Sequence, residues 1–214
     1  ILTSIGGKTH LINIKINVTL KPNLNINITT ENHDQINLEY QHDGSLFGTI
    51  HYEATGKTEY AQAMGRVSGA QIAATGCNMA FAPVVDITYN WECEEVLLRA
   101  YGNDPKLVAD MGKAYMDGIH ETAGVYSCAK HFPGNGQDFR DAHIANNINT
   151  CNEQEWMATY GHVYKTLIDG DLDAIMGGHI MMPAYMREVK PGITDEEMLP
   201  ATLCPEIMTG LLRD

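Results

Sequence analysis

One segment of the sequence concentrates side chains that donate, accept or transfer protons. It covers residues 130–143 and reads Lys-His-Phe-Pro-Gly-Asn-Gly-Gln-Asp-Phe-Arg-Asp-Ala-His. Asp141 and His143 stand two positions apart, so in an extended loop both point to the same side. The carboxylate then accepts a hydrogen bond from one ring nitrogen, which raises the imidazole pKa and leaves the other nitrogen as an acid or base. A purely local Asp–His contact is the simpler alternative, but Lys130, His131 and the glycines of the same segment favour a catalytic site.

The other polar residues of interest follow candidate strands. Asp86 ends the apolar run 78–85, Lys130 and His131 follow the run 125–129, and His179 follows the run 173–176. Amphipathic helices are expected between these runs, at 58–75, from 105, from 152 to 170, and from 205. Strands that alternate with helices predict a parallel sheet, and the carboxyl ends of such strands form the active site of a (β/α) barrel or of a doubly wound open sheet.

Two of these helices have clear start signals. Asp104 is placed to cap the helix that begins at Pro105, because proline tolerates the first turn and aspartate accepts a hydrogen bond from its N–H groups. Asn152 and Glu155 have the spacing of a capping box. No glycine-rich phosphate fingerprint follows a strand, which disfavours the nucleotide-binding version of the open sheet.

The number of strands limits the architecture. Four strands of the barrel type are expected, including a short one at 36–39, whereas a complete barrel has eight and about 250 residues. The fold class is therefore predicted as α/β, a partial (β/α)8 TIM-type barrel with about strands two to five. Residues 1–33 are expected to form an atypical Asn- and Ile-rich β segment, because apolar residues alternate from Ile12 to Ile28 around Lys21-Pro22-Asn23. Residues 34–214 are assigned to the barrel.

Composition excludes several partners. The chain has 27 acidic and 14 basic residues, a formal net charge of −13, which argues against nucleic acid and against an anionic membrane surface. No apolar run approaches the roughly 20 residues that span a bilayer. The five cysteines are widely spaced without a CxxC pair, which is typical of reduced thiols and of a cytoplasmic location. No cofactor and no metal ion are expected.

The segment at 130–143 resembles the K-H-F-P-G-x-G…D-x-H signature of family 3 glycoside hydrolases, in their β-N-acetylhexosaminidase branch. Three more segments are similar to the family in order and spacing: Phe81-Ala82-Pro83-Val84-Val85-Asp86, Arg99-Ala100-Tyr101-Gly102-Asn103-Asp104-Pro105, and Met176-Gly177-Gly178-His179. The resemblance covers about residues 36–214. It implies a hydrolase that releases terminal β-linked N-acetylglucosamine, with a small carbohydrate as its substrate.

The resemblance also assigns roles by position. His143 is the catalytic acid/base, paired with Asp141 on a mobile loop. Lys130, His131 and Arg99 hold sugar hydroxyls, and His179 lies near the site. Asp86 either contacts the substrate or pairs with Arg99 to hold the loop. The expected substrate-binding residues are thus Lys130, His131, Arg99, His179 and Asp86.

The sequence departs from the family at the nucleophile. A retaining mechanism needs a carboxylate opposite the acid/base, and in the family an Asp on the sixth strand supplies it, beyond the position of Asp214. We therefore expect this chain alone not to hydrolyse an aryl N-acetylglucosaminide. The second-strand motif also differs, since residues 37–41 read Asn-Leu-Glu-Tyr-Gln where the family often has D-x-E-G-G.

Three other functions stay open. An enzyme that transfers the sugar to phosphate in place of water has the same sequence features. A histidine acid/base is compatible with that reaction, because a neutral histidine repels phosphate less than a carboxylate does. A metal-dependent hydrolase would use His131, Asp138, Asp141, His143 and His179 as zinc ligands, although Lys130 beside them repels a cation. A non-catalytic sugar-binding remnant also fits the missing nucleophile.

Overall fold

The computed structural model describes residues 2–5, 8–11, 25–29, 35–39, 57–97, 99–142 and 144–213. Two compact units divide the chain, Ile1–Gly44 and Ser45–Asp214. The domain boundary predicted between residues 33 and 34 falls among residues outside this described part. Among the described residues, none of the helices combines the length and the apolar character needed to cross a membrane.

The described part of the first unit consists of two antiparallel strand pairs. β1 (Leu2–Ile5) pairs with β2 (Lys8–Leu11), and β3 (Asn25–Thr29) pairs with β4 (Gln35–Glu39). Residues 36–39 therefore do form a strand, but its pairing is antiparallel and the parallel pairing expected from the sequence is wrong. The connection over residues 30–34 explains this, because a parallel crossover needs a dozen or more residues. Most of the alternating segment that begins at Ile12 lies outside the described residues.

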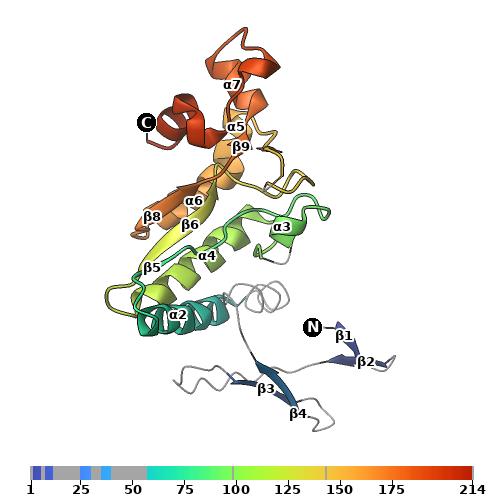
Figure 1. Cartoon of the computed structure of the whole chain (residues 1–214), viewed down its shortest axis with the longest axis vertical. Coiled ribbons are helices and arrows are strands. Elements are labelled where there is room, and N and C mark those ends of the chain that lie inside the picture. Colours follow the sequence, from blue (N-terminus) through green and yellow to red (C-terminus); the bar gives the residue numbers. More distant parts are fainter. Residues whose placement is uncertain are drawn as a thin grey trace. The chain divides into compact units, whose positions relative to one another are not determined.

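The second unit alternates strands with helices, as predicted (Figure 1). Its strands and helices in chain order are α2 (Thr58–Ala74), β5 (Met79–Ala80), α3 (Glu94–Leu97), α4 (Pro105–His120), β6 (Tyr126–Phe132), β7 (Asn147–Ile148), α5 (Glu153–Trp156), α6 (His162–Ile168), β8 (Ala174–Gly177), β9 (Ile180–Met181) and α7 (Pro183–Val189). Four further helical turns are η1 (Met157–Gly161), η2 (Asp195–Glu197), η3 (Ala201–Leu203) and η4 (Glu206–Leu211). The result is a mixed α/β unit with parallel strands.

β6 is the central strand of the parallel sheet, with β5 on one side and β8 on the other. Met79 lies opposite Tyr126, and Cys128 lies opposite Ala174. The strand expected over residues 78–85 is regular only at β5, and the chain then meets β6 again where Val84 pairs with Lys130. A core of fully buried side chains covers the sheet, including Val85, Phe132, Tyr160 and Leu167. Phe132 packs edge-on against the rings of Trp156 and Tyr164.

Glycines let α2 and α4 pack with their backbones close together. A Cβ atom built at Gly65 would lie 1.9 Å from the carbonyl oxygen of Tyr115, and one at Gly118 would lie 2.0 Å from that of Gln62. A side chain at either position would therefore separate the helices. Between them the hydroxyl of Tyr115 donates to Ser68 Oγ at 2.8 Å, so the buried phenol keeps a partner.

The helix starts follow the predicted signals. Asp104 caps α4 by accepting from the amide of Lys106 at 2.9 Å. Asn152 and Glu155 form a reciprocal capping box at the start of α5, which continues through η1 into α6. The helix expected from residue 205 begins at Glu206. These local signals were readable because each depends on residues within one turn of the chain.

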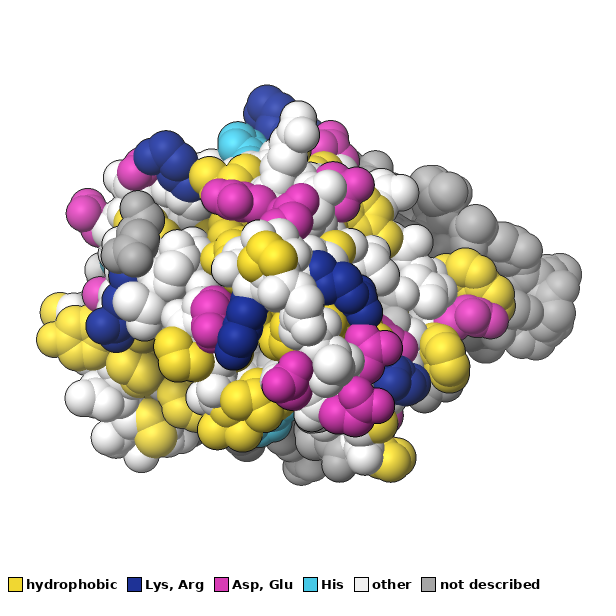
Figure 2. Space-filling model, turned by 90° about the horizontal axis from the view of Figure 1, so that it is seen from above, with side chains coloured by type: hydrophobic (Ala, Val, Ile, Leu, Met, Phe, Trp, Pro, Cys, Tyr) yellow, Lys and Arg dark blue, Asp and Glu magenta, His cyan; other side chains and the backbone are white. Residues whose placement is uncertain are grey.

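Figure 2 shows Lys and Arg side chains interspersed with Asp and Glu side chains, with hydrophobic side chains between them. Along α4 and α6, three ion pairs join residues four positions apart: Lys106–Asp110, Lys113–Asp117 and Lys165–Asp169. Each such pair contributes only about 0.3–0.5 kcal/mol. These ion pairs therefore add little to the stability of the fold.

A partly buried polar cluster joins the amino ends of β6 and β8. Asp173, which directly precedes β8, accepts from the backbone amide of Ser127 at 2.7 Å and from its hydroxyl at 2.8 Å. Its Oδ2 also lies 2.7 Å from His120 Nε2 at the end of α4. Burial raises the pKa of Asp173, but the Ser127 and His120 contacts outweigh it and hold this pKa below its usual value. The carboxylate therefore links the end of α4 to the amino ends of β6 and β8.

Candidate active site

The site residues gather where β6 ends, because the chain before Asp86 runs alongside this strand. The amide of Val85 donates to the carbonyl oxygen of Lys130 at 2.8 Å, and the amide of Lys130 donates to that of Pro83 at 3.1 Å. This pairing brings Asp86 next to His131. The Lys130–His131 and Phe132–Pro133 peptide bonds are cis.

Asp86 holds His131 through both its ring and its backbone. The carboxylate accepts from the amide of His131 at 3.1 Å through Oδ1 and lies 2.7 Å from His131 Nδ1 through Oδ2. Asp86 is completely buried, whereas the side chain of His131 is 25% exposed. The pKa of Asp86 is raised by burial and lowered more strongly by the His131 ring and by two backbone amides, so it stays below its usual value. A carboxylate on Nδ1 leaves Nε2 of His131 for the site.

This geometry defines how Asp86 takes part. Its carboxylate bonds to His131 and to the amide of Asn135, the latter at 2.7 Å, and not to Arg99, the partner considered from the sequence. The carboxylate is buried and already engaged by these donors, so it holds the His131 ring and the start of the loop. The residue therefore positions a neighbour at the site.

The loop after β6 is built onto the segment that follows Asp86. The carbonyl oxygen of Gly136 accepts from the amides of Tyr89 and Asn90 at 3.1 and 2.8 Å. Gly136 has a φ of 105°, and a Cβ atom there would lie 2.0 Å from the carbonyl oxygen of Ile87. Only glycine permits both the backbone conformation and this close approach. The start of the loop is thereby fixed to the segment that follows Asp86.

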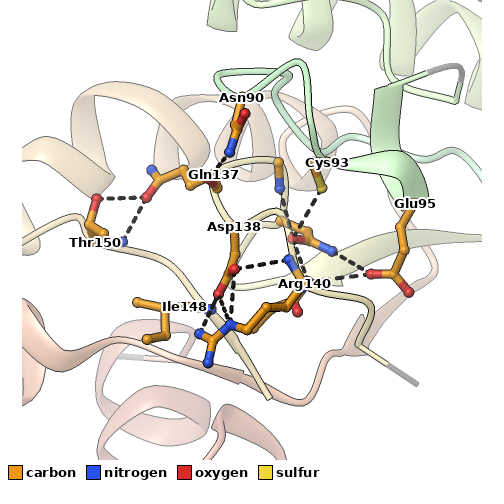
Figure 3. A network of polar contacts seen from close by, with 11 residues as sticks. Asn90, Cys93, Glu95, Gln137, Asp138, Arg140, Ile148 and Thr150 are labelled. Atoms are coloured by element: carbon orange, nitrogen blue, oxygen red, sulfur yellow. Dashed lines mark hydrogen bonds and ion pairs between the residues drawn. The ribbon is translucent and has the colours of Figure 1, made fainter. Parts of the chain in front are cut away.

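Asp138 and Arg140 tie the middle of the loop to its end (Figure 3). Asp138 accepts from Arg140 Nε at 2.9 Å through Oδ2 and also from Arg140 Nη2, while the amide of Ile148 donates to Oδ2 at 2.8 Å. Burial raises the pKa of Asp138, but the arginine and two backbone amides lower this pKa by more, so it lies below its usual value. Asp138 is thus occupied by an ion pair that organises the loop.

Asp141, one member of the predicted dyad, follows Arg140 in the loop. Asp141 is exposed, and its carbonyl oxygen accepts from the amides of Ile144 and Ala145 at 2.9 and 3.0 Å. His143 lies outside the described residues. Its pairing with Asp141 stays a prediction.

The remaining site residues come from two other segments. Arg99 is half-buried and donates from Nη1 to the carbonyl oxygen of Glu95 at 3.1 Å. His179 is exposed, and its Nδ1 lies 2.7 Å from Thr202 Oγ1. The amide of Gly178 donates to the carbonyl oxygen of Phe132 at 2.7 Å, which places the segment before His179 beside the end of β6. Lys130, His131, Asp86 and Gly178 therefore share one end of the sheet.

Three polar residues of this region were missed by sequence reasoning. They are Glu95, Asn135 and Asn147, whose side chains bond to one another beneath the loop. Asn135 belongs to the signature segment at 130–143, but no motif marks its partners Glu95 and Asn147, which lie in other segments and meet it only through the fold. Among the described residues no group of three or more His, Cys, Asp or Glu side chains is arranged to hold a metal ion.

The parallel strands, their connecting helices and the polar site at the strand ends define an α/β enzyme domain. Residues 40–214 match the glycosyl hydrolase family 3 N-terminal domain, and the chain belongs to this family. A β-N-acetylglucosaminidase/β-glucosidase of Cellulomonas fimi is 40% identical over 161 residues, which are 75% of this chain and 28% of that protein. The chain thus spans less than a third of that relative's length.

Solved structures of relatives agree with this assignment. A β-glucoside phosphorylase superposes with a TM-score of 0.74 at 38% identity, over 81% of this chain and 30% of that chain. A family 3 β-N-acetylglucosaminidase from Paenibacillus sp. superposes with a TM-score of 0.68 at 32% identity, over 77% of this chain and 30% of that chain. The similarity therefore extends to enzymes that break glycosidic bonds with different acceptors.

Proposed function

We propose that this chain forms part of a (β/α)8 barrel that hydrolyses terminal β-linked N-acetylglucosamine with retention of configuration. The observation that carries the proposal is the Asp86–His131 pair at the end of β6, because a carboxylate on Nδ1 fixes the ring and leaves Nε2 of His131 to contact a sugar hydroxyl, the role that the family resemblance implies for this residue. The parallel arrangement of β5, β6 and β8 supports a partial barrel. The similarity to β-N-acetylglucosaminidases supports the choice of sugar.

In this proposal the residues at the strand ends bind the sugar. Lys130, Arg99 and the Nε2 of His131 contact its hydroxyl groups, and Asp86 keeps the His131 ring in one orientation. His179 lies beside them at the end of β8. Cationic donors suit this role, since hydrogen bonds from charged groups to sugar oxygens fix the ring geometry.

The chemical step is assigned to the loop. His143, oriented by Asp141, gives its proton to the leaving oxygen while a carboxylate attacks the anomeric carbon and the glycosidic bond breaks. Water then gives its proton back to His143 and releases the sugar from the carboxylate. We propose that this carboxylate is the Asp of the family's sixth strand, supplied from outside residues 1–214.

Phosphorolysis is the second candidate, favoured by the similarity to a β-glucoside phosphorylase. In that reaction phosphate replaces water in the second step and the product is a sugar 1-phosphate. A neutral imidazole as acid/base repels the phosphate dianion less than a carboxylate does. The protein architecture is the same for both reactions.

Sugar binding is tested first on the 214-residue chain. We expect N-acetylglucosamine to bind saturably in isothermal titration calorimetry, and Lys130→Ala to weaken binding by about 10-fold or more, the effect of losing a charged hydrogen bond. Lys165→Ala removes an exposed lysine of α6 and serves as the control with unchanged affinity. Absence of saturable binding, or equal affinity of the Lys130→Ala variant, would contradict the proposal.

Turnover is tested in the polypeptide that also carries the nucleophile. His143→Ala is expected to lower hydrolysis of 4-nitrophenyl β-N-acetylglucosaminide by about 10²–10⁴-fold. Azide should then restore turnover and give a β-glycosyl azide, the product of a retaining enzyme. Phosphate that yields a sugar 1-phosphate would identify the phosphorylase, and sugar binding without any turnover would overturn the enzymatic assignment in favour of a binding protein.

A further inference from the structure

The loop that carries Asp141 is closed at its base by two asparagines. Asn147 donates from Nδ2 to Asn135 Oδ1 at 3.0 Å, which joins the start of the loop to its end. Asn135 is 4% exposed and Asn147 is completely buried. The two residues therefore meet in a position where side-chain amides need partners within the protein.

Glu95 joins both asparagines from below. Its Oε2 accepts from Asn135 Nδ2 at 3.2 Å and from Asn147 Nδ2 at 3.3 Å. Hydrogen bonds to a carboxylate are stronger than those between neutral groups, so Glu95 contributes most of the attraction that holds the two ends together. We call Glu95, Asn135 and Asn147 the loop clamp.

An unpaired atom shows that this arrangement is constrained. Asn147 Oδ1 is buried and has no hydrogen-bond partner in the structure. The opposite amide orientation would move Nδ2 away from Glu95 and Asn135, and would place an oxygen against two oxygens. The fold thus leaves one acceptor unpaired in order to keep both donor contacts of the clamp.

The same glutamate also touches the proposed sugar-binding arginine. Arg99 Nη1 donates to the backbone carbonyl oxygen of Glu95 at 3.1 Å. Glu95 lies in α3, a helix of 4 residues. One residue therefore contacts Arg99 through its main chain and both loop ends through its carboxylate.

We propose that Glu95 is a positioning residue. Its carboxylate holds Asn135 and Asn147 together and thereby places the loop that bears Asp141, a member of the proposed acid/base pair. The inference rests on the proposed function for the catalytic use of this loop. Glu95 itself touches no substrate.

Hydrogen–deuterium exchange of the loop amides tests the clamp in the chain as it exists. Glu95→Gln keeps the shape of the side chain and removes its charge, so amides of residues 136–146 are expected to exchange about 10-fold faster or more. Glu92→Gln, an exposed neighbour on the same segment, is the matched control with unchanged exchange. Equal exchange in Glu95→Gln and the unmodified chain would overturn the clamp.

Added N-acetylglucosamine tests the proposed function separately. Glu95→Gln keeps the main-chain contact to Arg99, so it should bind the sugar with an affinity within about 3-fold of that of the unmodified chain. A much larger loss of affinity would show that Glu95 acts at the sugar site and would contradict a role confined to the loop. If no sugar binds to either chain, the proposed function fails, while the exchange difference without sugar still decides on the clamp.

A second variant guards against misfolding of the first. Asn147→Ala opens the clamp from the other side and should accelerate loop exchange to a similar degree. Because both substitutions break the same contact, the double variant should exchange no faster than either single variant. Fully additive effects would show that Glu95 and Asn147 act independently and would contradict the clamp.

In the polypeptide that carries the nucleophile, the leaving group distinguishes positioning from a general loss of structure. Glu95→Gln should lower kcat/KM for an alkyl N-acetylglucosaminide, because its leaving group needs a proton to depart. It should leave kcat/KM for the dinitrophenyl glycoside nearly unchanged, because kcat/KM reports the step in which the leaving group departs and dinitrophenolate departs without protonation. An equal loss for both substrates would contradict the positioning role.

Discussion

Asp86 and His131 form a buried carboxylate–imidazole pair, with 2.7 Å between Asp86 Oδ2 and His131 Nδ1. The carboxylate also accepts from the amides of His131 and Asn135. It therefore joins the end of β6 to the start of the loop. Because three donors converge on one fully buried side chain, this pair is the structural centre of the site.

Replacement of Asp86 should be costly for folding. Asp86→Ala removes the acceptor for three donors, and each buried donor left unpaired costs about 1–3 kcal/mol. We expect the free energy of unfolding to fall by at least about 3 kcal/mol in urea denaturation followed by circular dichroism. Asp104→Ala, which removes an exposed helix cap, should cost only about 1 kcal/mol. Similar losses in the two variants would contradict the central role of Asp86.

Gly136 should tolerate no side chain. Gly136→Ala combines a left-handed backbone conformation with a Cβ atom 2.0 Å from the carbonyl oxygen of Ile87, so the loop must move. Gly76 also has a positive φ, but a Cβ atom added there would meet nothing within 4 Å, so Gly76→Ala should cost only about 1 kcal/mol of backbone strain. Urea denaturation should show a clearly larger loss for Gly136→Ala, and sugar binding should weaken in that variant alone.

The Asp138–Arg140 pair predicts a pH-dependent stability. The folded-state pKa of Asp138 lies below its usual value, which is about 3.9 in an unfolded chain. Its stabilising contribution is therefore present above about pH 4 and is lost as the pH falls through the folded pKa. Arg140→Gln should lower the free energy of unfolding by about 1–3 kcal/mol at neutral pH.

This difference should shrink in acid. Urea midpoints of Arg140→Gln and the unmodified chain should converge at low pH, because protonated Asp138 no longer gains from the arginine. Lys165→Gln, which breaks an exposed pair, should change the midpoint little at either pH. A difference that stays constant with pH would show that Arg140 stabilises the fold by packing alone.

The sequence predicted features that depend on neighbouring residues better than features that depend on contacts between distant segments. The caps at Asp104 and Asn152 were predicted correctly because each bonds within its own first turn. The pairing of residues 36–39 was wrong, since strand propensity does not specify a partner. The irregular path from Phe81 to Asp86 was also missed, because its buried apolar residues have the same pattern as a continuous strand.

The same distinction applies to the candidate site. Its location at the strand ends followed from sequence, because polar residues come directly after apolar runs. The partner of Asp86 did not, since the sequence suggested Arg99 and only the pairing of residues 83–86 with β6 brings His131 beside Asp86. The loop clamp gave no signal at all, because Glu95 is separated from Asn147 by 52 positions.

Thiol labelling should report the burial of the cysteines. Cys77 is exposed, and Cys93, Cys128, Cys151 and Cys204 are buried. Burial raises the pKa of each of the four buried thiols, which lowers the reactive thiolate fraction. Native protein should therefore react quickly with Ellman's reagent at one of its 5 cysteines and at all of them only in denaturant. Fast reaction of a second thiol in the native state would indicate local opening.

β6 carries an anchor at each end, and both anchors come from neighbouring segments. Asp173 binds the amide of Ser127 near its beginning, and Asp86 binds the amide of His131 near its finish. A slip of the strand by one residue would break both contacts at once and would turn every side chain to the opposite face. The two aspartates therefore fix the register of β6, and with it the positions of Lys130 and His131 at the end of the sheet.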